Sequence, residues 1–319
     1  MPRAPHFGDW LALLVLTVLW GSAFVLNELA LASFPPSVLV GGRIVIAALL
    51  VYGYLRLTGQ ALPRPGRAWL PMLVLAVFGN VLPFHLIAWA QQHIDASLAG
   101  ILMAVMPLFV LSLAHFFVPG ARLTPYRVAG FVAGFTGVIV VIGPALPHGL
   151  SGNAVLLGAI AALGSALSYS ISAIYARRLG AGDPLRRSAG MLLVASMLSA
   201  PMALADLSMV TPPSVASVVA MIALGLLATG FATLLYFRLI EGPGPTFLSF
   251  VNYLVPAWAV IAGAVFLDES LSPAVFLGLT MILAGIGFSE LGARAMDRLT
   301  AMRLRYVRFS SPSIVEEDA

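Results

Sequence analysis

The sequence predicts an all-α membrane protein in which ten transmembrane helices form two inverted five-helix repeats around a central cavity. Three observations lead to this prediction. The chain has a mean hydropathy of +0.99, and only 9% of its residues are charged, whereas soluble domains carry about 25%. Its apolar segments reach the length of about 20 residues that a helix needs to cross a bilayer. The second half of the chain also repeats the pattern of the first.

The repeat is visible in two stretches that begin 149 residues apart, at 95–125 and 244–273. Each contains a proline twelve residues after its start, Pro107 in the first and Pro256 in the second. After an apolar run, each ends in a leucine, a hydroxyl residue and a second proline. A repeat at a fixed period indicates that the chain is built from two copies of one unit.

Ten apolar segments account for nearly the whole chain. Each is too long for a membrane β-strand, which needs only about 9 to 11 residues, so we expect helices. The first is longer than the apolar core of a signal peptide, and nine similar segments follow it, so we expect it to stay as an anchor. The segments are residues 10–31, 37–57, 69–89, 96–118, 126–142, 154–175, 188–205, 215–240, 245–267 and 273–291.

These segments divide the chain into two repeats with short flanking parts. We expect a cytoplasmic N-terminus at 1–9, a first repeat at 10–143, an external linker at 144–153 and a second repeat at 154–292. Residues 293–319 are predicted to form a cytoplasmic basic segment and a disordered acidic tail. The chain has no cysteine, which excludes disulfides and thiolate metal sites.

The arginines indicate how the helices are oriented. The chain has no lysine, and with ten crossings every arginine except Arg43 falls on one side of the membrane. The positive-inside rule then places both termini in the cytoplasm, which for this multi-pass chain means the inner side of the plasma membrane. Because five is an odd number, the second repeat enters from the opposite side. Inverted repeats of this kind are a recurring design of secondary transporters.

Four motifs resemble those of the EamA-type permeases of the drug/metabolite transporter superfamily. They are Trp20-Gly21-Ser22-Ala23-Phe24, Arg43, the stretch 96–107 and Asp268-Glu269-Ser270-Leu271-Ser272. The resemblance covers residues 10–291 and implies a ten-helix exporter or permease of small metabolites with its binding cavity between the halves. The branch that the chain most resembles is that of the bacterial aromatic amino-acid exporters. The first repeat lacks the acidic turn, because its matching turn is expected on the cytoplasmic side.

Polar and aromatic residues within the spans are the candidate substrate-binding groups, because polar groups in hydrocarbon turn toward the protein interior. Several recur at three- and four-residue spacing, which places them on one helix face. The serines of the sixth segment fit helix packing equally well. The candidates are Trp20, Phe24, Asn27, Arg43, Asn80, His85, Trp89, Met103, Tyr169, Ser172, Thr233, Tyr236, Asn252 and Tyr253.

Some of these residues have two interpretations. His85 either takes up a proton or is a buried neutral histidine that joins two helices. Arg43 either pairs with Glu28 or receives a substrate carboxylate at the outer gate. Pro107 and Pro256, at matched positions of the repeats, are either hinges or static kinks.

These features predict a secondary-active or facilitative transporter that exports small metabolites by alternating access. The expected solutes are amino acids with aromatic or other apolar side chains, and xenobiotics. We expect the solute and membrane lipid as partners, a monomer or homodimer, and no nucleic acid, cofactor, metal or catalytic residue. A carrier of nucleotide sugars or sugar phosphates is the first alternative, although Arg43 is the only arginine inside a span. A membrane-embedded enzyme is the second, although no HExxH-like spacing is present.

Overall fold

The computed structural model describes residues 3–64, 66–119, 124–143, 150–180 and 182–289. All regular secondary structure in these residues is helical. Eight helical stretches are long and apolar enough to cross a membrane, and two shorter apolar helices, Val251–Phe266 and Pro273–Ser289, follow them. The all-α membrane class is thus confirmed. Part of the expected linker at 144–153, and the whole C-terminal segment at 293–319, lie outside the described residues.

The first half contains five helical segments in chain order. They are α1 (Phe7–Leu31), α2 (Pro36–Leu57), a third segment made of α3 (Trp69–Ala76), η1 (Val77–Val81) and α4 (Leu82–Ala90), a fourth made of α5 (Ala96–Met103) and α6 (Met106–Phe117), and α7 (Pro125–Ile142).

The second half follows the same order. It contains α8 (Leu150–Leu179), α9 (Pro184–Ala205) with the short η3 (Leu207–Met209), an eighth segment made of α10 (Val215–Ala223), η4 (Leu224–Phe231) and α11 (Ala232–Glu241), a ninth made of α12 (Pro245–Leu248) and α13 (Val251–Phe266), and the final helix Pro273–Ser289. Proline occupies the first position of five helices, among them α2 and α9, where its missing N–H has no intrahelical partner to lose.

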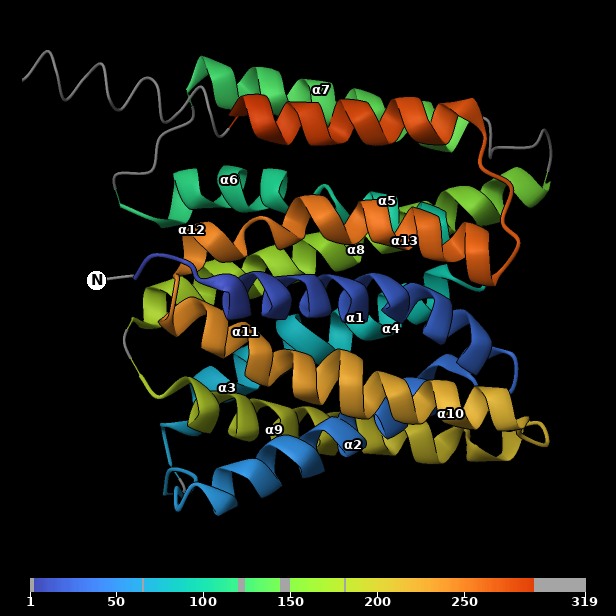
Figure 1. Ribbon diagram of the computed structural model, residues 1–319. Coiled ribbons are helices and arrows are strands. Elements are labelled where there is room, and N and C mark those ends of the chain that lie inside the picture. Colours follow the sequence, from blue (N-terminus) through green and yellow to red (C-terminus); the bar gives the residue numbers. More distant parts are fainter. Residues whose placement is uncertain (1–2, 65, 120–123, 144–149, 181, 290–319) are drawn as a thin grey trace, which may run out of the picture.

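The helices run side by side in one bundle (Figure 1). The helix α1 packs against the eighth segment and α13, while α8 packs against the third segment and α5–α6. The helix α2 contacts α9, and α5 contacts α13. The helix α7 and the final helix form a pair at one edge, and α2 and α9 lie at the opposite edge.

The third and eighth segments are π-helical at their centres. In η1 the bonds run to the carbonyl five residues back, as from Leu82 N to Val77 O. The carbonyl of Phe78 then has no donor, because the residue five positions later is Pro83, which has no N–H. Ser168 of α8 replaces this bond, with its Oγ 2.9 Å from Phe78 O. Ser165 of the same helix donates to Pro83 O at 3.0 Å, so these two serines of α8 join it to the third segment.

The two candidate hinge prolines lie differently with respect to the helix breaks. The fourth segment is interrupted between α5 and α6, directly before Pro107, where the Ala104 N–H bonds back only three residues to Ile101 O. The ninth is interrupted between α12 and α13, whereas Pro256 lies inside α13. The breaks are therefore not at matched distances from the prolines, and a hinge role for either residue stays a prediction.

The helix α7 and the final helix approach so closely that glycine is required at their crossing. A Cβ at Gly137 would lie 2.7 Å from Gly278 O, and a Cβ at Gly278 would lie 2.6 Å from Gly137 O. The same holds two turns away, where a Cβ at Gly285 would lie 2.6 Å from Gly130 O. Because ascending residues of α7 meet descending residues of the final helix, the two helices are antiparallel. Small residues let membrane helices pack at such distances.

We expect Gly285→Leu to lower the melting temperature in detergent, because the added side chain has no space against the α7 backbone. Overpacking of this kind costs about 1–3 kcal/mol. The matched control is Gly287→Leu on the same helix, because nothing lies within 4 Å of a Cβ at Gly287. Equal melting temperatures for the two variants in a thermal unfolding assay would contradict the close crossing.

Candidate functional site

Arg43 of α2 is the centre of a buried polar cluster formed by several of the predicted residues. Its side chain is only 6% exposed. Its Nε donates to Thr229 Oγ1 of η4 at 2.7 Å, and its Nη1 makes a long hydrogen bond of 3.5 Å to Asn27 Oδ1 of α1. The guanidinium lies over the ring of Phe84, 3.9 Å from its centroid. Tyr169 of α8 packs edge-on against the same ring at 6.3 Å.

A chain of amides orients the groups that face Arg43. Gln91 Nε2 donates to the backbone carbonyl of Phe24 at 2.8 Å, so Gln91 Oε1 is the free acceptor and receives Asn27 Nδ2 at 3.1 Å. Asn27 Oδ1 is then the atom left to face Arg43. Because a carbonyl only accepts, the orientation of both amides follows from the Phe24 backbone.

Thr229 has a second bond that fixes its hydroxyl. Its Oγ1 donates to Leu224 O, five residues back in η4, at 2.8 Å, and therefore presents a lone pair to Arg43. Thr233 donates to Thr229 O at 2.6 Å. Every group bonded to the guanidinium is thus neutral and held in an accepting orientation.

The predicted alternative of an Arg43–Glu28 ion pair is wrong. Within the described part of the chain the two ion pairs join Asp9 to Arg3 and to His6, and none reaches Arg43. Asn27 faces Arg43, and the next residue of a helix is rotated by about 100°, so Glu28 points elsewhere. Its buried Oε2 has no hydrogen-bond partner.

The predicted residues of the third segment differ in how far they are exposed. Asn80 is 4% exposed, and its Nδ2 has no hydrogen-bond partner. His85 Nδ1 lies 2.7 Å from Val81 O of its own helix, and its buried Nε2 is likewise unpartnered. Trp89 is 39% exposed and packs against His93 with ring centroids 4.4 Å apart.

The other predicted residues form separate groups. Trp20 and Tyr236 pack together, with ring centroids 5.8 Å apart. A Cβ at Gly79 of η1 would lie 2.7 Å from Ser172 Oγ, so this serine packs against the third segment. Met103 and Tyr253 pack on the largest apolar cluster of the bundle. Asn252 is half-buried on α13.

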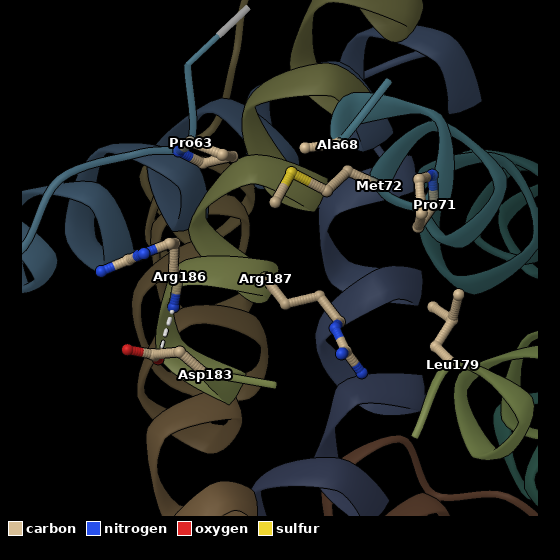
Figure 2. A pocket seen from close by; sticks show the side chains of 8 residues that line it. All are labelled: Pro63, Ala68, Pro71, Met72, Leu179, Asp183, Arg186 and Arg187. Carbon is tan, nitrogen blue, oxygen red and sulfur yellow. Dashed lines mark hydrogen bonds between the residues drawn. The ribbon is translucent and has the colours of Figure 1, made fainter. Parts of the chain in front are cut away.

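A hollow of about 300 Å³ lies elsewhere, at an arginine-rich end of the bundle (Figure 2). Asp183 caps α9 there by accepting a bond from Arg186 N at 3.0 Å. None of the predicted residues lines this hollow. Its lining consists of Pro63, Ala68, Pro71, Met72, Leu179, Asp183, Arg186 and Arg187.

Two residues with clear roles were not among the predicted ones. Gln91 completes the amide chain, and Glu269 joins the turn after α13 to the start of α5. The carboxylate of Glu269 accepts bonds from Ala96 N at 2.8 Å and Ser97 N at 3.0 Å. It thus caps a helix N-terminus, where a negative charge is favourable. Glu269 belongs to the acidic motif at 268–272 of the sequence analysis, but the sequence did not indicate which residues its carboxylate binds.

The family model described as "EamA-like transporter family" matches residues 6–143 and residues 156–290. The chain belongs to the EamA-like transporter family. In this EamA-like transporter the two matched stretches overlap the predicted repeats at 10–143 and 154–292.

Several curated proteins are similar to this EamA-like transporter over most of their length. "Uncharacterized inner membrane transporter YedA" of Escherichia coli K12 is 29% identical, with 90% of this chain and 91% of the relative covered. "Uncharacterized transporter YvbV" of Bacillus subtilis 168 is 26% identical, with 90% and 92% covered. "Probable amino-acid metabolite efflux pump" of Escherichia coli K12 is 24% identical, with 90% and 96% covered.

A solved crystal structure has the same fold. It matches this EamA-like transporter with a TM-score of 0.66 at 22% identity, and covers 92% of this chain and 99% of the solved one. At this identity the likeness concerns the fold alone.

We expect Glu269→Ala to lower the melting temperature, because the N–H groups of Ala96 and Ser97 lose a charged acceptor. Hydrogen bonds to charged groups contribute about 1.5–3 kcal/mol each, and surface exposure reduces this figure. Asp268→Asn is the matched control: Asp268 is exposed, and its φ of 53° is a conformation that Asn tolerates. If the two variants unfold at the same temperature, the cap does not stabilise the protein.

Proposed function

We propose that this EamA-like transporter is a secondary-active or facilitative carrier that exports small metabolites by alternating access, with apolar and aromatic amino acids as its main solutes. The observation that carries the proposal is the buried polar cluster around Arg43. Its bonds join α1 and α2 of the first half to η4 of the second. A solute bound there contacts both halves, so that a movement between them changes the side to which the solute is exposed.

The contacts between helices support an inverted repeat. The position of α8 between the third segment and α5–α6 corresponds to that of α1 between the eighth segment and α13. The crossing of α7 with the final helix is reciprocal: 148 residues separate Gly130 from Gly278 and Gly137 from Gly285, and Gly130 meets Gly285 while Gly137 meets Gly278. Exchanging the halves reproduces this set of contacts, as a two-fold axis in the membrane plane requires.

The choice of amino acids rests on the composition of the cluster and on one relative. The aromatic rings of Phe84 and Tyr169 lie beside hydrogen-bonding groups, which suits a solute with an apolar side chain and a polar head. The relative named "Probable amino-acid metabolite efflux pump" is consistent with such a solute.

The inverted orientation predicts opposite accessibility for equivalent positions. Gln92 and Glu241 lie 149 residues apart and are exposed. Because the chain has no cysteine, Gln92→Cys and Glu241→Cys each introduce a single thiol. We expect a membrane-impermeant maleimide applied to intact cells to label the thiol at 92 and to reach the one at 241 only after permeabilisation. The same accessibility for both thiols would contradict the inverted repeat.

Counterflow tests the transport activity itself. Proteoliposomes loaded with unlabelled L-phenylalanine are expected to accumulate labelled L-phenylalanine with saturable kinetics, and empty liposomes are the control. We expect His85→Ala to leave this flux and its response to a pH gradient unchanged, because the ring bonds only within its own helix. Loss of the pH response in this variant would assign a proton to His85. Absence of saturable flux across a panel of amino acids and xenobiotics would contradict the proposed function.

A further inference from the structure

Arg43 is a buried cation without an anion. No carboxylate of the described residues lies within ion-pairing distance of it. Its hydrogen-bond partners, Thr229 and Asn27, are neutral. An ion removed from water costs several kcal/mol unless an opposite charge compensates it, and intramembrane arginines are accordingly rare and functional. The cluster therefore carries a net positive charge that the surrounding side chains do not balance.

The guanidinium has bonds on one edge and none on the other. Nε and Nη1 bond to Thr229 and Asn27, and one face lies on Phe84. The structure gives no hydrogen bond to Nη2. A carboxylate binds to a guanidinium most strongly through two parallel N–H···O bonds, and the terminal edge formed by Nη2 and the second hydrogen of Nη1 has this geometry. The neutral acceptors Thr229 and Asn27 fix the position of the guanidinium but do not neutralise its charge.

A second buried donor lies on the neighbouring helix. Asn80 lies four residues before Phe84 in the third segment, about one helical turn away, and the ring of Phe84 contacts the Arg43 guanidinium. It is 4% exposed, and its Nδ2 has no partner. A buried amide donor without an acceptor is rare in proteins. Arg43 Nη2 and Asn80 Nδ2 are thus both N–H donors without a hydrogen-bond acceptor.

We propose that Arg43 is the receptor for the carboxylate of the transported solute, with Asn80 as a further donor to it. This inference rests on the proposed transport function and adds the substrate class: monocarboxylates and zwitterionic amino acids with apolar side chains. Amines and esters that lack the carboxylate bind more weakly. A single guanidinium matches a single negative charge, so sugar phosphates with two charges fit less well.

The test uses solutes that differ only at the carboxylate. Reconstituted full-length protein is assayed for counterflow of labelled L-phenylalanine in competition with 3-phenylpropionate, L-phenylalanine methyl ester and phenethylamine. We expect 3-phenylpropionate to compete, and the ester and the amine to compete roughly 10- to 100-fold more weakly, the range of a lost charged hydrogen bond. L-leucine and its methyl ester extend the comparison to aliphatic side chains.

Variants separate recognition from a structural role. Arg43→Gln is expected to abolish the preference for the acid over the ester, measured as the ratio of their effects on melting temperature in detergent, and Arg43→Lys to retain part of it. Arg56→Gln, at an exposed position of the same helix, is the control and keeps the full preference. A purely structural Arg43 would weaken acid and ester equally.

The outcomes distinguish this inference from the proposed function. If the ester and the amine compete as well as the acid in the unmodified protein, Arg43 is not the receptor, although the protein transports. If glucose 6-phosphate competes and the amino acids do not, the substrate class is wrong. If no member of the panel moves or binds, the transport proposal fails and this inference fails with it.

Discussion

The hydrocarbon core of a membrane requires a partner for every backbone N–H and C=O, and the local structure of this protein follows from that requirement. In η1, Pro83 leaves the carbonyl of Phe78 without a backbone donor, and the hydroxyl of Ser168 supplies the bond. The ends of helices obey the same rule, as at the carboxylate of Glu269. These side-chain hydrogen bonds connect segments that are far apart in the sequence.

The departures occur at equivalent places in the two halves, and the polar cluster lies between them. Asn80 in η1 and Thr229 in η4 are 149 residues apart. The same interval leads from Arg43 to Leu192, a fully buried apolar residue of α9. The backbone irregularities are thus duplicated, whereas the charge is present in one copy only. For the carrier that we propose, this places the charged group of the site on one of the two halves only.

Sequence reasoning reached the helical class and the residues at the centre of the cluster, because length, hydropathy and helical spacing depend on local composition. Asn27 and Tyr169 were found in this way, and Arg43 because it is the only arginine inside a predicted span. Gln91 was missed because its partners lie more than sixty residues away and have no periodic relation to it. The π-helices have no propensity signal. Trp89 shows a further limit: spacing places residues on one helix face, but the packing of neighbouring helices sets how much of that face is exposed, here 39% for Trp89.

The amide chain that starts at Phe24 has a consequence for the charge of the cluster. A carbonyl can only accept, so the backbone of α1 directs Gln91 Oε1 toward Asn27 Nδ2, and this leaves Asn27 Oδ1 to face Arg43. An aspartate at position 27 would occupy the same volume and would bring a permanent internal counter-ion to the guanidinium. Nitrogen in place of one oxygen at this position leaves the guanidinium without a carboxylate among the described residues, and the proposed solute carboxylate would supply the missing charge.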